Sequence, residues 1–311
     1  SDRGAIAEAL AASKVGLGEL AAAVDVGTNS VLLIVGKVED GELTVVEEHG
    51  ATPRLGAGLA RTGSLDDGAI ERTMEVLRHF VERMDINGVS PERRRFTGTA
   101  VLRRASDADL FIERAREELG IELEVLPEEE EARLSHAAVV GSGVAPEVVV
   151  IDVGGGSTEL AWDEGSGRAS IPVGAVVLTE SWLGLSGSAP LVEGGWEALL
   201  DAVEEAVSAL PEGIAADREC VLVGGAALNM ACLDQGLEVF DARLAEGWEV
   251  SVGALETTMN ELALAPLPKV RTLPSSDQVL VPPPGAVKVP SALMVSRSSE
   301  QSSLSTHSPT K

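Results

Sequence analysis

Two short glycine loops carry the same polar residues in the same order. The segments VDVGTNS (24–30) and IDVGGGS (151–157) each place Asp, Gly and Ser at identical intervals. Asp25 and Asp152 each end an apolar run, where an ionised carboxylate persists only if it is hydrated, paired or bound to a metal ion. The glycines that follow allow backbone N–H groups to approach an anion closely. The two loops therefore predict a site for phosphate together with a hydrated cation such as Mg²⁺.

The surrounding residues exclude two familiar phosphate-binding motifs. A Walker A loop needs a lysine before Ser or Thr, and neither loop contains one. A dinucleotide fingerprint opens a helix, whereas residues 157–163 alternate as a strand does. Hydroxyl donors are present at Thr28, Ser30, Ser157 and Thr158. One such loop alone would be an ordinary strand–turn, but two copies in the same context favour paired halves of one site.

The elements around the two loops repeat as well. Each loop lies between a buried strand and a second strand, and a turn then leads to a third; in the first copy that turn is the hairpin signal Asp40-Gly41. The predicted strands cover 20–26, 30–38 and 43–49 in the first copy, and 147–153, 157–163 and 168–174 in the second. A duplicated three-strand unit explains this order.

Helices and further strands are predicted between and after the copies. Capping patterns beginning at Ser64 and Ser106 predict two helix starts, the second helix ending at Gly120. Pro127 predicts a third start, with four glutamates in the first turn. Further strands are predicted at 94–100, 121–126 and 219–225, and a helix at 196–210. From Pro266 onward the chain is rich in Pro and Ser and is predicted to be irregular.

Composition restricts the class of protein. The chain has 311 residues and a formal net charge of −26, which disfavours binding to nucleic acid or to an acidic membrane. No apolar run reaches the roughly 18 residues of a membrane span, and the first residues lack a signal-peptide pattern. Cys220 and Cys232 form no metal or disulfide framework. We expect a cytoplasmic protein that binds neither nucleic acid nor membrane.

Five segments together resemble a known family. They are VDVGTNSVLLIV, GTAVLRRASDADLFIERA, IELEVLPEEEEARL, VVVIDVGGGSTEL and IPVGAVVLTE, and their order is similar to that of the exopolyphosphatase and guanosine pentaphosphate phosphohydrolase family. The resemblance covers roughly residues 20 to 240 and looks like the family's short, two-lobe form. It implies an α/β fold with two duplicated actin/ribonuclease H-like lobes, each a mixed sheet with flanking helices, and a cleft between them. The expected domains are a first lobe (1–143), a second lobe (144–265) and an irregular C-terminal segment (266–311).

The resemblance also implies roles for individual residues. Glu131, directly before Ala-Arg, matches the family's general base, whereas four glutamates after a proline also suit any helix N-terminus. Arg103 and Arg54 match arginines expected at the phosphate; an alternative for Arg103 is a solvated pair with Arg104. The implied metal ligands are Asp25, Asp152 and Glu159. The implied phosphate contacts of the loops are Gly27, Thr28, Asn29, Ser30, Gly154, Gly155, Gly156 and Ser157.

The function implied is a Mg²⁺-dependent hydrolase in which Glu131 activates water. It would release terminal phosphate from inorganic polyphosphate, or convert guanosine pentaphosphate to tetraphosphate, and could act as a homodimer. Two alternatives remain, a non-catalytic polyphosphate- or nucleotide-binding regulator and a small-molecule kinase of the same superfamily. The chain departs from the family at Ala226, where threonine is usual, and after RTLP (271–274), where an Arg-Ala-Asp segment is expected. The family's closing helix and strand are also hard to find near the C-terminus.

Overall fold

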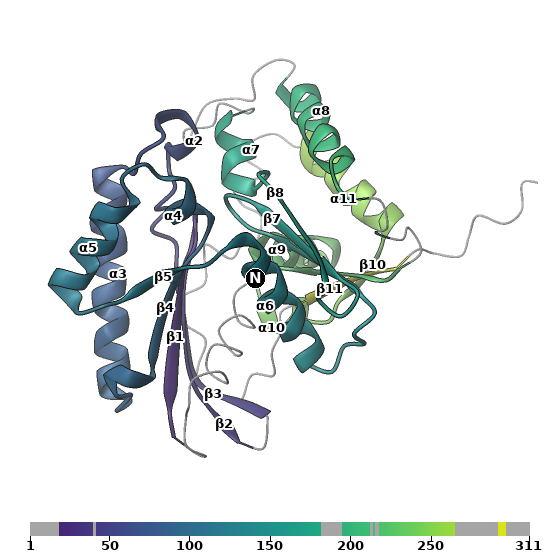
Figure 1. Cartoon of the computed structure of the whole chain (residues 1–311). Coiled ribbons are helices and arrows are strands. Elements are labelled where there is room, and N and C mark those ends of the chain that lie inside the picture. Colours follow the sequence, from purple (N-terminus) through teal and green to yellow (C-terminus); the bar gives the residue numbers. More distant parts are fainter. Residues whose placement is uncertain are drawn as a thin grey trace, which may run out of the picture.

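The protein has two mixed β-sheets that follow one another along the chain, each accompanied by helices (Figure 1). The computed structural model describes residues 19–39, 42–181, 195–211, 214, 218–264 and 292–296. The hairpin turn predicted at 40–41 and most of the segment from residue 265 onward lie outside these ranges.

The first sheet has the strand order β3-β2-β1-β4-β5. Its strands are β1 (Ala21–Val26), β2 (Val31–Glu39), β3 (Glu42–Ala51), β4 (Arg94–Gly98) and β5 (Leu123–Val125). The first three are antiparallel, and β4 and β5 run parallel to β1. Every residue of β1 is buried, as its continuous apolar sequence predicts for a central strand.

The second sheet repeats this arrangement. Its order is β10-β11-β9-β6-β7-β8, so β8-β7-β6-β9 reproduces β3-β2-β1-β4. The strands are β6 (Val149–Val153), β7 (Thr158–Trp162), β8 (Gly167–Ile171), β9 (Cys220–Val223), β10 (Glu249–Ser251) and β11 (Ala292–Ser296). The duplicated three-strand unit and the two-lobe α/β architecture are thereby confirmed.

The helices of the first lobe lie largely on one face of its sheet (Figure 1). They are α2 (Leu59–Thr62), α3 (Asp67–Ile86), α4 (Ala100–Arg104) and α5 (Ala108–Leu119), with a 3₁₀ turn at Pro91–Arg93. Met74, Leu77 and Met84 of α3 are buried against the sheet, as their helical spacing predicts.

The remaining helices accompany the second sheet. They are α6 (Glu128–Gly141), α7 (Ala175–Ser181), α8 (Gly195–Ser208), α9 (Gly225–Asp234), α10 (Ala242–Ala245) and α11 (Val252–Leu264). Helix α6 precedes the domain boundary expected after residue 143, yet it packs on β6, β7 and β8. By its contacts it therefore belongs to the second lobe. No helix in the described ranges is both long and apolar enough to cross a membrane.

Two predicted helix caps are wrong by one or two residues. Asp66, not Ser64, caps α3, because its carboxylate accepts the Ala69 N–H at 3.0 Å. Asp107, not Ser106, precedes α5, and its carboxylate accepts the Leu65 N–H at 3.0 Å instead of capping its own helix. This longer-range hydrogen bond joins the starts of the two helices, which no local pattern could show.

Residues 292–296 correct the prediction of an irregular C-terminal segment. They form β11, which runs parallel to β10 and antiparallel to β9. The run ALMVS has the length and apolar character of a short strand. It gives hydrogen-bond partners to the edges of two other strands, which would otherwise leave backbone groups unsatisfied.

Substituting a core residue of the central hairpin should destabilise the first lobe. Leu33 on β2 is fully buried in its core, so Leu33→Ala should lower the free energy of unfolding by about 2–5 kcal/mol. Val46→Ala on the adjacent strand β3, where the side chain is 42% exposed, should change it by only about 0.5 kcal/mol. Urea unfolding followed by circular dichroism measures both. Equal effects of the two substitutions would contradict this assignment of the core.

Candidate functional site

The two glycine loops meet on one cleft between the lobes. The cleft has a volume of about 1240 Å³, and its lining includes Gly27–Ser30 from the first lobe and Gly154–Ser157 from the second. The loops connect β1 to β2 and β6 to β7, so each occupies the same position in its own sheet. The pairing expected from the repeated sequence is therefore present in the structure.

Both loops have the same turn. The Gly27 N–H donates to the Ser30 carbonyl at 2.9 Å, and the Gly154 N–H donates to the Ser157 carbonyl at 3.0 Å. Identical Gly-to-Ser intervals therefore give identical backbone closures.

The loops also touch each other. A Cβ atom at Gly156 would lie 2.6 Å from Thr28 Oγ1 and 3.0 Å from Ala100 Cβ. The first of these distances is shorter than real Cβ atoms make with any neighbouring heavy atom. A Cβ at Gly155 would be 3.2 Å from the Thr28 Cβ. Glycine is therefore required where the second loop approaches the first.

Three buried carboxylates lie at the ends of the paired strands. Asp25, Asp152 and Glu159 are 3%, 2% and 2% exposed, respectively. Asp152 faces Glu159 across the β6–β7 ladder, whereas Asp25 faces Leu32 in the first lobe. Of the three, only Asp152 lines the cleft. The repeat is thus not symmetrical in charge, because the carboxylate pair exists only in the second lobe.

Glu159 is held in a polar but enclosed environment. Its Oε1 accepts hydrogen bonds from the hydroxyls of Ser157 at 2.6 Å and Ser170 at 3.1 Å. Burial and the nearby Asp152 charge raise the pKa of Glu159 to about 7. Asp152 in turn accepts a hydrogen bond from the Ser135 hydroxyl of α6 at 2.8 Å.

Two of these carboxylates, Asp152 and Glu159, fit a magnesium site in which the protein supplies only one or two ligands. Among the described residues, no three or more His, Cys, Asp and Glu side chains converge as metal ligands do, so Asp25, Asp152 and Glu159 do not form a single cage. Mg²⁺ commonly binds through one or two carboxylates, several waters and substrate phosphates. Asp152 on the cleft wall, with Glu159 beside it, has that character, because two adjacent buried carboxylates favour a cation between or near them. A metal contact from Asp25 stays a prediction.

Glu131 reaches the cleft from the first turn of α6. Its side chain is on the cleft wall and only 9% of the residue is exposed. Arg103 of α4 donates from Nη1 to the Glu131 carboxylate at 2.8 Å and to the Leu126 carbonyl at 2.7 Å. The guanidinium therefore fixes the orientation of the carboxylate.

Arg103 itself lies behind Glu131 and does not line the cleft. Its buried position excludes a solvated pair with Arg104, because only 16% of its side chain is exposed. Nε and Nη2 have no hydrogen-bond partner within the described part of the chain, although Glu128 and Glu159 lie 3.9 and 4.0 Å away. Both nitrogens are buried, and the predicted phosphate contact of Arg103 stays a prediction.

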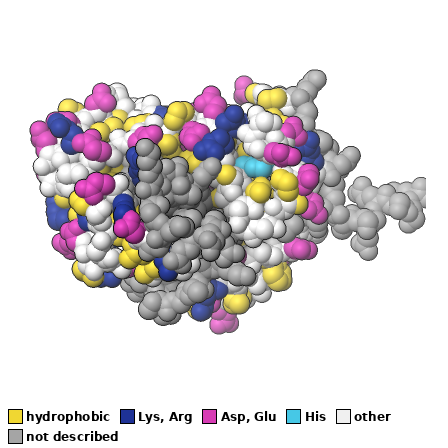
Figure 2. All heavy atoms as spheres, turned by 60° about the horizontal axis from the view of Figure 1, so that its bottom comes forward, with side chains coloured by type: hydrophobic (Ala, Val, Ile, Leu, Met, Phe, Trp, Pro, Cys, Tyr) yellow, Lys and Arg dark blue, Asp and Glu magenta, His cyan; other side chains and the backbone are white. Residues whose placement is uncertain are grey.

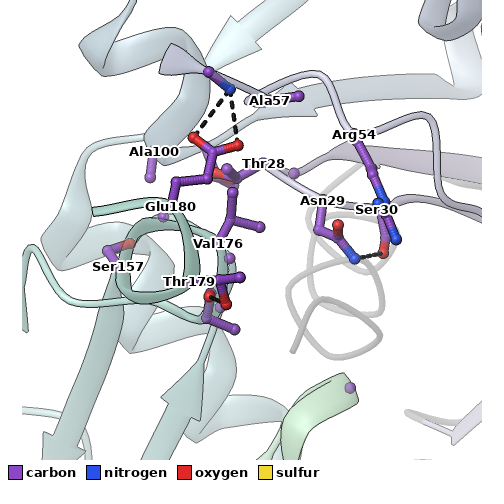
Figure 3. A pocket seen from close by; sticks show the side chains of 18 of the residues that line it. Thr28, Asn29, Ser30, Arg54, Ala57, Ala100, Ser157, Val176, Thr179 and Glu180 are labelled. Atoms are coloured by element: carbon purple, nitrogen blue, oxygen red, sulfur yellow. Dashed lines mark hydrogen bonds between the residues drawn. The ribbon is translucent and has the colours of Figure 1, made fainter. Parts of the chain in front are cut away.

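Arg54 lies on the cleft wall as the motif suggested (Figure 3). Its backbone is left-handed, with φ of 58°, which is uncommon for a residue with a side chain. The Arg54 N–H donates to the Asn29 carbonyl at 3.0 Å, and the Gly56 N–H donates to the Thr28 carbonyl at 2.9 Å. The first phosphate loop thus holds the segment that carries Arg54.

Several residues at or beside the cleft were missed from the sequence. Ser135 does not line the cleft but donates to Asp152; it follows Glu131 by one helical turn, and this i, i+4 spacing could have indicated it. Arg61, Arg72, Glu180 and Asn229 line the cleft, and no local pattern indicated them. Ala226 lies on the wall too, so the departure from threonine removes a hydroxyl from the cleft. The expected Arg-Ala-Asp segment would fall outside the described residues.

Both the outer surface and the cleft carry charges of either sign. Figure 2 shows acidic side chains scattered over the visible face, several with basic side chains beside them. The cleft lining contains Arg54, Arg61 and Arg72 from the first lobe, together with the carboxylates of Asp66, Asp67, Glu131, Asp152 and Glu180. A strongly acidic chain therefore still presents guanidinium groups where an anion would enter.

Replacing Glu159 should change the pH dependence of stability in metal-free protein. Between pH 4.5 and 7 the folded protein binds a proton at Glu159 that the unfolded chain has released. The free energy of unfolding should therefore fall by up to about 3 kcal/mol as pH rises through this interval. Above pH 7 it should level off. Glu159→Gln should remove this component. Urea unfolding in EDTA from pH 4.5 to 8 measures it, and parallel curves for the two proteins would contradict it.

The Ppx/GppA phosphatase family model matches residues 34–271. Similar curated proteins include the guanosine-5'-triphosphate,3'-diphosphate pyrophosphatase of Photobacterium profundum, 33% identical over 197 residues, which are 62% of this chain and 39% of that protein. The protein of the same name from Vibrio vulnificus is 33% identical over 202 residues, covering 62% of this chain and 40% of that protein. The match thus spans about two fifths of the length of these relatives.

Solved structures match over most of both chains. A Ppx/GppA family member from Aquifex aeolicus is 28% identical, with 83% of this chain and 84% of that chain covered and a TM-score of 0.65. An exopolyphosphatase-like protein is 26% identical, with 82% and 80% covered and a TM-score of 0.73. With the duplicated sheets and the facing glycine loops, these matches show that the chain belongs to the Ppx/GppA phosphatase family.

Proposed function

We propose that this protein hydrolyses the terminal phosphoanhydride bond of an anionic phosphate chain. The substrates would be inorganic polyphosphate, guanosine pentaphosphate, or both. The observation that carries the proposal is that two glycine loops from different lobes line one cleft together with the Glu131 carboxylate. Membership of a phosphatase family and the names of the relatives support the same class of reaction.

The loops would bind the terminal phosphoryl group. Their backbone N–H groups and the hydroxyls of Thr28 and Ser30 provide donors that need little rearrangement. Arg54, on the cleft wall, would contact an oxygen of the same or the next phosphate. Because both loops line the cleft side by side, a phosphoryl group bound there would accept hydrogen bonds from both lobes.

Glu131 would act as the general base. Its carboxylate, oriented by Arg103, would accept a proton from a water molecule as the water oxygen attacks the terminal phosphorus. The bond from phosphorus to the bridging oxygen breaks, and the shortened chain leaves with the bonding electron pair. No covalent intermediate with the protein is needed.

Magnesium would complete the site at Asp152, with Glu159 beside it. When bound there it would supply positive charge to the phosphate oxygens during the transfer. Asp152 holds its place through the Ser135 hydroxyl, and Glu159 through Ser157 and Ser170. The chain's own hydroxyl groups thus arrange the carboxylates for a cation.

Removing the carboxylate charge of Glu131 should suppress turnover. Glu131→Gln should lower phosphate release from long-chain polyphosphate or guanosine pentaphosphate by about 10²–10⁴-fold, because an amide does not accept the proton from water. Glu129→Gln, in the same helical turn but exposed, should retain activity. Malachite-green detection of phosphate, with Mg²⁺ present, measures both.

The other results of this assay identify the alternative functions. If wild type and Glu131→Gln bind polyphosphate but neither releases phosphate, the protein is a binding protein. ATP-dependent phosphorylation of a small acceptor would identify a kinase. Equal turnover by wild type and Glu131→Gln would remove Glu131 from the chemistry.

Mg²⁺ should stabilise the protein through Asp152. At about one hundred times its Kd, the ion should raise the free energy of unfolding by about 2.7 kcal/mol. Asp152→Asn should lose most of this gain, whereas Asp201→Asn on the exposed face of α8 should keep it. Thermal unfolding with EDTA and then with added Mg²⁺ measures the effect. An undiminished gain in Asp152→Asn would place the ion elsewhere.

A further inference from the structure

Helix α7 connects the second phosphate loop to the first lobe. At its start, the Ala175 and Val176 N–H groups donate to the carbonyls of Gly154 and Gly155, both at 2.9 Å. In its last turn, the Glu180 carboxylate accepts the Gly58 N–H at 2.8 and 3.0 Å (Figure 3). A helix of seven residues thus contacts one loop directly and reaches across to the other lobe.

Gly58 ends the segment that carries Arg54, residues 53–58, which we call the strap. The strap lies beside the first phosphate loop. The N–H groups of Arg54 and Gly56 donate hydrogen bonds to carbonyls of that loop. Arg72 donates from Nε to the Pro53 carbonyl at 3.0 Å, so the strap's beginning is held within its own lobe. Its end is held by Glu180 from the opposite lobe. Left-handed Arg54 needs such support, because a conformation of this kind persists only where its surroundings fix it.

The contact between Glu180 and Gly58 lies where α7 packs against α2. Leu59, Val176 and Val177 line a small void of about 10 Å³ beside it. Glu180 is half-buried there. It also lines the main cleft, where a carboxylate would repel an anionic substrate. A carboxylate at that position therefore weakens binding of an anionic substrate. Its hydrogen bonds with the Gly58 N–H give a reason why glutamate is nevertheless present there.

A reciprocal contact runs in the other direction. Arg104 of α4, in the first lobe, donates from Nη1 to the Gly156 carbonyl of the second phosphate loop at 3.0 Å. Each phosphate-binding segment is therefore tied to a charged side chain from the opposite lobe. Neither residue needs to contact the substrate to have this effect.

We propose that Glu180 is a positioning residue that fixes the strap and so holds Arg54 over the substrate's phosphate groups when the lobes are together. It acts through Arg54 and increases affinity for the anionic chain without touching it. This inference rests on the proposed function. It predicts a change in KM, because a wrongly placed Arg54 weakens binding, with little change in kcat, because Glu131 is unaffected.

Four variants test the inference by steady-state kinetics with polyphosphate. Glu180→Ala should raise KM about tenfold, the effect of one hydrogen bond to a charged group, with kcat within about threefold. Glu180→Asp keeps the charge but is shorter by one methylene and should behave like Glu180→Ala. Glu180→Gln keeps an acceptor oxygen at the same reach and removes the repelling charge, so its KM should equal or fall below that of wild type. Glu204→Ala, an exposed position on α8, is the matched control and should change neither constant.

A double variant tests whether Glu180 acts through Arg54. In an Arg54→Ala background, adding Glu180→Ala should raise KM no further, since the residue being positioned is gone. Multiplicative effects would overturn the inference, as would a Glu180→Gln variant as impaired as Glu180→Ala. An unchanged KM in both Glu180→Ala and Glu180→Asp would also overturn it.

Hydrogen exchange provides a readout that does not need activity. In substrate-free protein, amides of the strap should exchange faster in Glu180→Ala and Glu180→Asp than in wild type, and at the wild-type rate in Glu180→Gln. Unchanged protection in all variants would refute the contact. If wild type releases no phosphate from either substrate, the proposed function fails, and the exchange measurement still decides whether Glu180 holds the strap.

Discussion

The contact between the two glycine loops is the constraint on which the site depends. A side chain at Gly156 would overlap Thr28 and one at Gly155 would crowd it, so the lobes approach to this distance because the second loop carries glycine at both positions. The close approach places backbone donors from both lobes on one cleft. It also leaves little room for adjustment, because the atoms that a side chain at Gly156 would meet belong to the short side chains of Thr28 and Ala100. The other features of the site, the buried carboxylates and the guanidinium groups, are arranged around this contact.

Electrostatics explains how a chain of net charge −26 could accept an anion. Interactions between exposed charges are screened over about 8–10 Å at ordinary salt concentrations, so the distant acidic surface matters less than the groups in the cleft. The arginines on the cleft wall come from the first lobe, and the buried Asp152–Glu159 pair comes from the second. The duplicated halves therefore differ in the buried carboxylate pair while keeping the same backbone turn.

Much of the fold could be predicted because the repeated sequence corresponds to a repeated local structure. The loops, their flanking strands and the helix carrying Glu131 follow from periodicity, glycine spacing and a proline. The contacts of individual charged residues could not be predicted, since they depend on distance in space. Arg103 was predicted to contact phosphate, with a solvated pair with Arg104 as the alternative, and the structure shows it bonded to Glu131. Glu180 has no distinguishing pattern, and its partner is a backbone N–H 122 residues away. β11 was missed for a related reason, since four apolar residues and a serine after a proline-rich stretch form a strand only when two other strands pair with them.

The packing of α6 gives the Arg103–Glu131 contact a further meaning. Glu131 travels with the second sheet, on which its helix rests, whereas Arg103 belongs to a helix of the first lobe. A rotation that parted the lobes would withdraw the guanidinium from the Glu131 carboxylate, whereas its hydrogen bond to the Leu126 carbonyl lies within the first lobe and would remain. If Glu131 is the general base, as proposed, its carboxylate would then lose the donor that orients it. The proposed hydrolysis would therefore depend on the lobes being together.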